Sequence, residues 1–431
     1  MSLALSPRDR ELLDGTHGDG AAFAMRLVVR AAEVTGAQRL IDVTRAHVDS
    51  CLYHGEATLD FVRRLSEGHA RVRIPTTLNV GALDLLHPEL YRGDPLTAER
   101  GRLLMDRYRA LGARPTFTCA PYQLTDVRPE LGEQVAWGES NAIAFCNSVL
   151  GARTNRYGDF IDIAAAVTGR VPDAGLHQTD ARRATLVLRL ADDVPAALRD
   201  ADVLFPVLGI VLGRRAGSAV AVIDGLAPGR SENLGQSEDR LKALGAAAAS
   251  SGSVAMFHVV GSTPEAPSLD AALQHRAPER VELIRLADLR AVRDELSTAT
   301  GERLAAVSLG TPHASLDELD RYAAMLGDRR VHPDVECLIS TGRDVLALAS
   351  ERGIVGRLRE AGVELLTDTC SYITPILRDA AAGPVMTDSG KWAYYAPGNI
   401  GASVVFGSSA ECIRSAVVGR VVRDFGPWGG A

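Results

Sequence analysis

Short apolar runs alternate with Gly-, Pro-, Ser- and Thr-rich turns and with amphipathic stretches along most of this chain. The alternation is typical of βα units, in which a helix follows each strand and packs on the sheet. The clearest series predicts strands over 304–309, 335–340, 363–367 and 402–406. Strands joined by helical crossovers lie parallel and are buried on both faces. The C-terminal third therefore predicts a parallel sheet covered by helices.

Helix starts and loops of this region can also be located from the sequence. Two helices begin with a capping box, Ser315-Leu-Asp-Glu318 and Ser408-Ser-Ala-Glu411, in which the Ser and Glu side chains each accept a hydrogen bond from a backbone amide. A further helix is predicted over 343–352. Loops are predicted over 310–314 and over the longer 388–401 segment, and long loops in compact domains are often functional.

The rest of the chain follows the same pattern with one interruption. The first third predicts strands over 40–43, 73–79 and 116–118, and helices over 58–67, 97–111 and 139–150. The middle contains apolar runs over 184–190, 203–212 and 219–223 with fewer helical signals between them, which indicates a separate α/β subdomain. We therefore predict an α/β protein with mostly parallel sheets, divided into an N-terminal region 1–170, a middle subdomain 171–280 and a C-terminal region 281–431.

Composition and charge narrow the class of protein. With 431 residues, 46% apolar and 23% charged, the chain is long enough to bury several cores without disulfides or metals. Its net charge is -7 and no basic face is visible, which argues against a nucleic-acid partner. The longest apolar run, 203–213, is too short to span a bilayer, and residues 8–11 are charged where a signal peptide would be apolar. We expect a cytoplasmic protein whose cysteines stay reduced.

The six cysteines fall into two groups. Cys51, Cys119 and Cys370 are predicted in loops directly after strands, where ligands of parallel sheets bind. The other three, Cys146, Cys337 and Cys412, lie in predicted helices or strands, where Cys packs as a small hydrophobe. A metal held by three widely separated thiolates would keep a coordination position open for a substrate oxygen.

Polar groups accompany these cysteines. Glu139-Ser-Asn141 opens a helix, although N-capping explains Ser140 equally well. The segment 151–156 offers Arg153, Asn155 and Arg156 to an anion such as a substrate carboxylate, but arginines near a helix C-terminus also complement its dipole. His313 lies at the mouth of its strand, where a capping or solvated His is the alternative. Ser389-Gly-Lys391 resembles the end of a P-loop, but Val385 stands where the first Gly is needed.

Taken together, these segments resemble the large subunit or region of the aconitase X family, a branch of the aconitase superfamily. The Ala-Arg-Thr-Asn-Arg156 and Asp-Thr-Cys370 segments are the most diagnostic. The matching pieces span most of the chain in order: His47-Val-Asp, Cys51-Leu-Tyr-His-Gly55, Pro75-Thr-Thr-Leu-Asn79, Thr118-Cys-Ala-Pro-Tyr122, Trp137-Gly-Glu-Ser-Asn141, Asn147 to Arg156, Gly310-Thr-Pro-His313, Thr367-Asp-Thr-Cys370 and Ser389-Gly-Lys391.

The resemblance implies dehydration of a hydroxylated carboxylic acid with the help of an iron-sulfur cluster. Of the family's two functional types, this chain is more similar to the cis-3-hydroxy-L-proline dehydratases than to the archaeal mevalonate 5-phosphate dehydratases. The archaeal type usually has a Cys where Thr311 stands here, and it generally lacks Cys51. We therefore expect Cys51, Cys119 and Cys370 to be the ligands, and a 2Fe–2S cluster in preference to 3Fe–4S or 4Fe–4S.

The resemblance also implies site residues and a partner. The expected catalytic groups are Lys391, Glu139 and His54, and the base is left unassigned. The expected substrate-binding residues are Asn79, Ser140, Asn141, Arg153, Thr154, Asn155, Arg156 and Ser389. Some relatives carry a small swivelling domain that closes over the site, and residues 421–431 cannot form one. We therefore expect a separate small subunit.

Two readings from other classes stay open. The chain could be an enzyme with Cys119 or Cys370 as nucleophile, assisted by His313 or His54. It could also be a scaffold subunit that binds neither a metal nor a small molecule. Metal analysis of the purified protein best separates the three.

Overall fold

The computed structural model describes residues 3–226, 234–379 and 382–430 of the chain. The chain divides into two compact units. Unit 1 consists of Met1–Leu83 and Gly93–Arg183, and unit 2 consists of Asp84–Arg92 and Ala184–Ala431. The short segment Asp84–Arg92 therefore belongs with unit 2, although its neighbours in the sequence on both sides belong to unit 1. The predicted three-part division of the chain stays a prediction.

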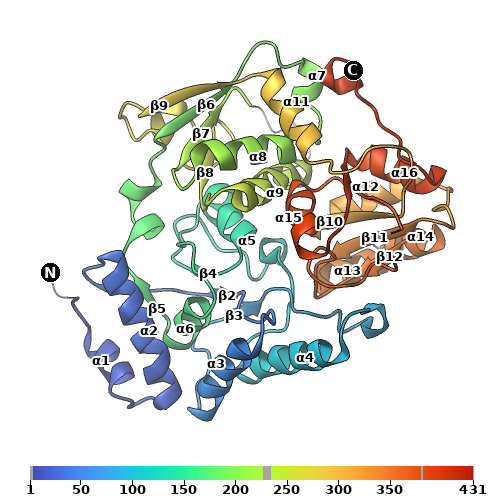
Figure 1. Ribbon diagram of the computed structural model, residues 1–431. Coiled ribbons are helices and arrows are strands. Elements are labelled where there is room, and N and C mark those ends of the chain that lie inside the picture. The colour runs from blue at the N-terminus through green and yellow to red at the C-terminus, as the bar shows by residue number, and fades with distance from the viewer. Residues whose placement is uncertain (1–2, 227–233, 380–381, 431) are drawn as a thin grey trace. The chain divides into compact units, whose positions relative to one another are not determined.

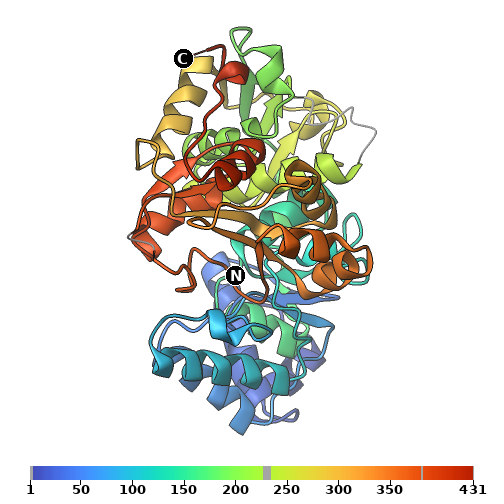
Figure 2. The same cartoon turned by 90° about the vertical axis from the view of Figure 1, so that its right-hand side faces the viewer.

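Unit 1 is built around a small parallel sheet. The strand order is β3-β2-β4, and both pairings are parallel. A separate antiparallel pair joins β1 to β5. Helix α4 packs against α3, and Figures 1 and 2 show the pair from two sides. The elements are α1 Pro7–Leu13, α2 Asp19–Thr35, β1 Leu40–Asp42, β2 Ala46–Val48, α3 Glu56–Glu67, β3 Thr76–Leu78, α4 Pro95–Ala110, β4 Ala136–Trp137, α5 Ser140–Phe145, α6 Ile161–Thr168 and β5 Arg170–Pro172.

Unit 2 contains two wholly parallel sheets. The first has the order β8-β7-β6-β9 and the second the order β12-β11-β10-β13-β14. The first sheet and its helices comprise β6 Leu186–Leu190, α7 Ala196–Arg199, α8 Leu204–Ala216, β7 Ala221–Asp224, α9 Leu234–Ser251, β8 Phe257–Val259, α10 Leu269–Ala272, β9 Arg280–Ile284 and α11 Leu286–Glu295. The second comprises β10 Ala306–Ala314, α12 Leu316–Leu326, β11 Glu336–Thr341, α13 Arg343–Glu351, α14 Ile354–Glu360, β12 Glu364–Leu366, β13 Val385–Thr387, α15 Gly390–Asn399, β14 Val404–Phe406 and α16 Ser409–Val418.

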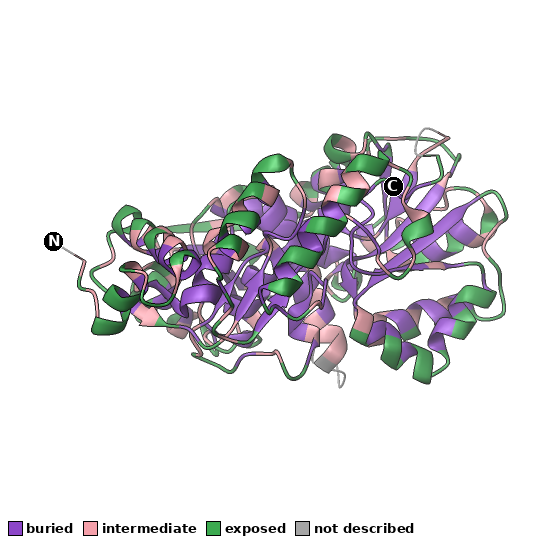
Figure 3. Cartoon of the chain, turned by 90° about the horizontal axis from the view of Figure 1, so that it is seen from below, coloured by how far each residue is buried: buried purple, intermediate pink, exposed green. Residues whose placement is uncertain are grey.

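Helix α12 illustrates how the sequence pattern produces this arrangement. Both sides of the predicted Ser315–Glu318 capping box are present at its start. Its buried residues, Leu319, Tyr322, Ala323 and Leu326, follow the helical spacing and join the core under the five-stranded sheet. The strands of this sheet are buried, whereas the outward sides of the helices are exposed (Figure 3). The predicted α/β class with mostly parallel sheets is confirmed.

Two predictions of irregular segments were wrong. Residues 310–314, predicted as a loop, continue strand β10 to Ala314, through a cis peptide bond between Thr311 and Pro312. The predicted loop over 388–401 contains helix α15, because the Ser389 hydroxyl caps it by accepting a hydrogen bond from the Trp392 amide, 3.0 Å away. Burial of Trp392, Ala393 and Ala396 then outweighs the helix-breaking residues of this stretch.

One predicted strand is absent, and one apolar run that had been given no element is a helix. Residues 116–118 form no strand, since Phe117 has a φ of 41°, outside the extended region. The apolar run 203–212 lies in helix α8, whereas its neighbours form the strands β6 and β7. Pro206 is tolerated because it falls in the first turn of α8, where backbone amides have no partner within the helix.

Candidate active site

In unit 1, polar groups follow the carboxyl ends of the parallel strands. Asp49, Asn79 and Gly138 directly follow β2, β3 and β4, so that one edge of the sheet gathers polar groups. The Asn79 amide donates to the Asp49 carboxyl group, and Asn79 is 2% exposed. Glu139 caps helix α5 by accepting a hydrogen bond from the Ala142 amide at 2.7 Å. Two of the predicted site residues, Asn79 and Glu139, therefore lie at this edge.

Cys51 lies three residues after the end of β2 and is fully buried. Its sulfur lies 3.1 Å from the carbonyl oxygen of Asn79, to which a thiol donates. Burial, followed by the charge of Asp49, raises the pKa of the Cys51 thiol well above its usual range. In the absence of a metal ion the sulfur is therefore protonated, since only a bound metal or a cation would favour the thiolate here.

Two buried carboxyl groups at this edge were missed by sequence reasoning. Burial, followed by the charges of Glu139 and Asp159, raises the pKa of Asp49 to about 8. Burial raises the pKa of Asp162 to about 6, although a hydrogen bond from the Ser50 hydroxyl opposes the shift. Asp162 is the only charged residue of α6, and an ionisable group in an apolar helix is a signal that could have been used. The cluster can hold a proton near neutral pH.

The Cys119 loop is fastened by Asn141. The Asn141 side-chain amide donates to the Cys119 carbonyl oxygen at 3.0 Å and accepts a hydrogen bond from the Tyr122 hydroxyl at 2.8 Å. Cys119 is 2% exposed, and Tyr122 stacks on Phe145 with ring centroids 3.8 Å apart. Asn141 thus orients the loop that carries a predicted ligand. The hydroxyl of Ser140, the residue before Asn141, lies 3.5 Å from the Glu139 carboxylate.

The predicted anion-binding segment is largely engaged with the protein itself. The Arg153 guanidinium donates to the His177 carbonyl oxygen and to the Thr179 hydroxyl, each at 3.0 Å. Asn155 donates to the Ala174 carbonyl oxygen at 2.8 Å, and Thr154 is fully buried. These contacts fasten the turn over 174–179. Arg156 and His54 are exposed. A substrate role for these residues stays a prediction.

In unit 2, the residues at the ends of β10 and β12 bring together a thiol and an imidazole. Cys370 and His313 are buried, and their ligand atoms lie within 4.8 Å of each other. The Nε2 atom of His313 lies 3.1 Å from the Thr369 carbonyl oxygen. Since a carbonyl only accepts hydrogen bonds, Nε2 carries the proton in this contact, which leaves Nδ1 as a ligand atom. A hydrogen bond from one ring nitrogen to a backbone carbonyl oxygen commonly orients a metal-binding His.

Lys391 lies at the start of α15. Its side chain is buried, with Nζ 5.8 Å from the centroid of the Tyr372 ring. Tyr372 in turn stacks on Tyr395 at 5.8 Å. The neighbouring Trp392 donates through its indole N–H to the Ser371 hydroxyl at 3.0 Å. The first turn of α15 and the Cys370 loop are therefore in direct contact.

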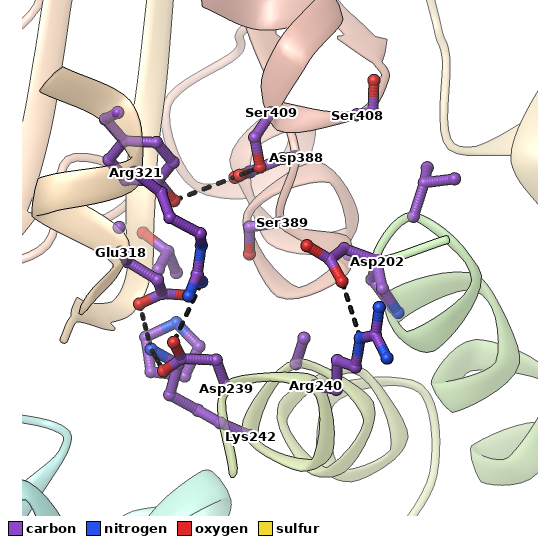
Figure 4. A pocket seen from close by; sticks show the side chains of 18 of the residues that line it. Asp202, Asp239, Arg240, Lys242, Glu318, Arg321, Asp388, Ser389, Ser408 and Ser409 are labelled. Atoms are coloured by element: carbon purple, nitrogen blue, oxygen red, sulfur yellow. Dashed lines mark hydrogen bonds and ion pairs between the residues drawn. The ribbon is translucent and has the colours of Figure 1, made fainter. Parts of the chain in front are cut away.

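Ser389 also lines an open pocket of about 650 Å³ in unit 2, with its side chain turned toward the open space (Figure 4). Buried and half-buried charges line this space. Lys242 of α9 pairs with Glu318 of α12 and lies 3.3 Å from Asp239, while Arg321 donates to Asp239 at 2.9 Å. Burial and the charge of Asp239 raise the pKa of Glu318 to about 7, although Lys242 opposes the shift. These charges neutralise one another across the pocket, a network that the sequence pattern did not reveal.

None of the six cysteines, all of which lie in the described part of the chain, forms a disulfide. Cys337 lies in β11, Cys412 in α16, and Cys146 in the π-helical turn that continues α5. No helix within residues 3–226, 234–379 and 382–430 is long and apolar enough to cross a membrane.

Comparisons with known proteins cover almost the whole chain. Sequence models of three aconitase X domains match it, the first domain over residues 2–180, the second over 184–294 and the third over 304–418. The crystal structure of Thermococcus kodakaraensis aconitase X in its holo-form is similar with a TM-score of 0.83 and 30% identity, covering 96% of this chain and 100% of that one.

Curated relatives have two kinds of name. The cis-3-hydroxy-L-proline dehydratase of Pseudomonas aeruginosa is 42% identical over 97% of this chain and 71% of the relative. The protein of the same name from Hypocrea jecorina is 40% identical over 97% of this chain and 69% of the relative. The phosphomevalonate dehydratase large subunit of Methanothermobacter thermautotrophicus is 34% identical over 95% of this chain and 98% of the relative.

Proposed function

Because the chain belongs to the aconitase X family, we propose that it is the large subunit of a dehydratase that removes water from cis-3-hydroxy-L-proline. The observation that carries the proposal is its 42% and 40% identity to two proteins named for that activity, against 34% to a relative named phosphomevalonate dehydratase large subunit. The α-proton and the 3-hydroxyl group would leave as water. The resulting enamine would tautomerise to Δ1-pyrroline-2-carboxylate.

The reaction makes two demands on the site. The α-proton is weakly acidic while the neighbouring carboxylate is ionised, so a cation must neutralise that carboxylate. Hydroxide is a poor leaving group, so an acid or a metal centre must take the oxygen as the bond breaks. We assign the first task to Lys391, because its buried ammonium lies in the first turn of α15, where the helix dipole also favours an anion.

Several other predicted residues have roles in the proposal. Glu139 and His54 are the candidate proton-transfer groups, and Asn79, Ser140 and Asn141 lie at or beside the same strand ends. In unit 2, Ser389 is the candidate hydrogen-bond partner of the substrate. Arg156 supplements Lys391 as a partner for the substrate carboxylate.

We propose that an iron-sulfur cluster assists the reaction, with Cys119 and Cys370 among its ligands. Thiolates and imidazoles are the donors that such clusters take, so the Cys370 and His313 pair of unit 2 fits the group. When bound, the cluster would act as a Lewis acid toward the departing hydroxyl group. Cys51 was expected as the third ligand, and His313 is the alternative because the Thr369 carbonyl oxygen holds its Nε2–H, a contact common for metal-binding histidines. A 2Fe–2S cluster remains our preferred type.

We further propose a separate small subunit as partner. The support is the name of the archaeal relatives, which are large subunits. Copurification of a small polypeptide with this chain, and activity only in its presence, is the expected result.

The test is to purify the chain with its partner, measure iron and sulfide per chain, record the visible spectrum, and assay both candidate substrates. We expect a coloured complex that consumes cis-3-hydroxy-L-proline. An iron-containing complex that is inert on cis-3-hydroxy-L-proline and active on mevalonate 5-phosphate would show that mevalonate 5-phosphate is the substrate. A colourless, metal-free and fully active complex would exclude the cluster. The variants Cys51→Ser and His313→Ala then decide the third ligand by which of them loses iron.

A further inference from the structure

The segment Asp84–Arg92 contacts both ends of the loop that carries Cys370. The segment belongs to unit 2, while Leu83 before it and Gly93 after it belong to unit 1. Its hydrogen bonds fall on residues 367, 368, 375 and 376, which flank Cys370 on both sides. A segment that fastens a ligand loop from outside can determine where the ligand atom lies.

At the start of the loop, the bonds converge on two buried carboxylates. The Asp84 side chain is 1% exposed and accepts hydrogen bonds from the Thr367 amide at 2.9 Å and the Thr367 hydroxyl at 3.0 Å. The next residue, Asp368, is fully buried and accepts from the Leu85 amide at 3.0 Å. The Arg343 guanidinium of α13 holds Asp368 through two nitrogens, with Nη2 at 2.6 Å.

Asp368 needs this support because of its backbone. Its φ is 62°, in the left-handed region that residues other than Gly adopt only when their surroundings hold them there. Asp368 is two residues before Cys370, so its backbone conformation sets the direction in which the loop leaves β12. Arg343 and Leu85 supply the bonds that hold it.

At the far end of the loop, Arg92 forms the second attachment. Its backbone amide donates to the Pro375 carbonyl oxygen at 2.8 Å, and its guanidinium Nε donates to the Ile376 carbonyl oxygen at 3.0 Å. The loop between these attachments carries Cys370 and also the Thr369 carbonyl oxygen that orients His313. Both candidate ligand atoms of unit 2 thus depend on a loop that is fixed at its two ends.

We propose that Asp84 and Arg343 are positioning residues that hold the Cys370 loop, and with it the Cys370 sulfur and the His313 ring, in place for a metal centre. As far as the metal centre is concerned, the inference rests on the proposed function. The partners of metal ligands commonly have this role, and changing them weakens metal binding about 10- to 100-fold. The contacts themselves belong to the chain and can be tested without a metal.

The test measures the rate at which iodoacetamide alkylates each cysteine of the metal-free full-length chain, mapped by mass spectrometry. The variants are Asp84→Asn and Arg343→Met, and Arg357→Met is the control, since Arg357 forms an exposed pair with Asp320 in the same unit. Cys337 and Cys412, both buried in unit 2, serve as internal references. We expect Cys370 to react roughly tenfold faster or more in both variants. In Asp84→Asn the buried Thr367 donors lose a carboxylate acceptor, and in Arg343→Met the buried Asp368 carboxylate loses its guanidinium donors. The two references and the control variant should not change.

Equal acceleration of all three cysteines would show that Asp84 and Arg343 only stabilise the unit, and it would overturn the inference, as would unchanged reactivity of Cys370. If neither variant folds, Arg343→Lys keeps the charge but loses the two-nitrogen contact, and the same comparison applies. When loaded with iron, the Asp84→Asn and Arg343→Met variants should bind it about 10- to 100-fold more weakly than the wild-type chain. A wild-type chain that takes up no iron would defeat the cluster proposal, while the alkylation result would still decide the role of Asp84 and Arg343.

Discussion

Replacing Lys242 by Met tests whether the buried charges of Figure 4 hold α9 against α12. The Lys242 side chain is 3% exposed, and its ammonium pairs with Glu318 and lies 3.3 Å from Asp239. Met preserves most of the length and the apolar contacts of the Lys stem. The change therefore removes the cation and leaves two largely buried carboxylates, of which only Asp239 keeps a cationic partner, Arg321.

The magnitude follows from burial. Removing one partner from a buried ion pair costs up to about 3–5 kcal/mol, because the remaining charge stays out of water without compensation. Protonation of Glu318, whose pKa is about 7 even beside Lys242, offsets part of this cost at pH 7. The matched control is Arg214→Met, which breaks the pair between Arg214 and Glu295 in the same unit, with side chains 39% and 61% exposed. An exposed pair contributes about 0–1 kcal/mol, so the two variants should differ clearly.

The assay is urea unfolding of the full chain at pH 7. A chain of two units need not unfold in one step, so the probe should report on unit 2 alone. Trp392 and Trp428 lie in unit 2 and Trp137 in unit 1, and a Trp137→Phe background therefore makes tryptophan fluorescence specific for unit 2. A loss from Lys242→Met that is no larger than the loss from Arg214→Met would refute the reasoning that these charges are shielded from water.

Three further predictions concern charge and ligands. Glu318 has a pKa raised from 4.5 to about 7, so its contribution to stability is complete below pH 4.5 and is lost as the pH rises through 7; Glu318→Gln should remove up to about 3 kcal/mol of that pH dependence, measured by urea unfolding from pH 4 to 8. Cys119→Ser should lose iron while Cys412→Ser retains it, and equal iron contents would contradict the ligand proposal. Lys391→Met should lower kcat/KM about 100-fold at unchanged thermal stability, whereas Arg153→Met should lower the melting temperature, because it breaks the contacts to the His177 carbonyl oxygen and the Thr179 hydroxyl.

The sequence predicted the elements of this fold well where local signals and burial agree. The strands at 335–340 and 363–367 and the capping boxes at Ser315 and Ser408 were found because each depends on neighbours within a few residues. The helix α15 was missed because Gly390, Pro397 and Gly398 are poor helix formers, and only the burial of its apolar face compensates for them. That burial is a tertiary effect, which a local pattern does not contain.

For the candidate site too, local features could be predicted from the sequence and contacts between distant residues could not. Strand ends can be located from apolar runs, and they led to the loop cysteines, whereas the role expected of Asn79 came from the resemblance alone. The pairs that join distant parts of the site could not be found, because Lys242 and Glu318 are 76 residues apart and Asp84 and Thr367 are 283 residues apart. Pairings of this separation depend on the packing of the sheets, and a single sequence carries no signal for them.

The arginines of unit 1 show why a charge in the sequence need not mark a binding site. Arg153 donates to the chain's own oxygen atoms, and the fully buried Arg182 does the same toward Asn147 and the Ala152 carbonyl oxygen. An arginine fixed in this way orders the fold and has fewer donors left for an anion. A substrate role for Arg153 therefore stays a prediction, which the Arg153→Met variant tests.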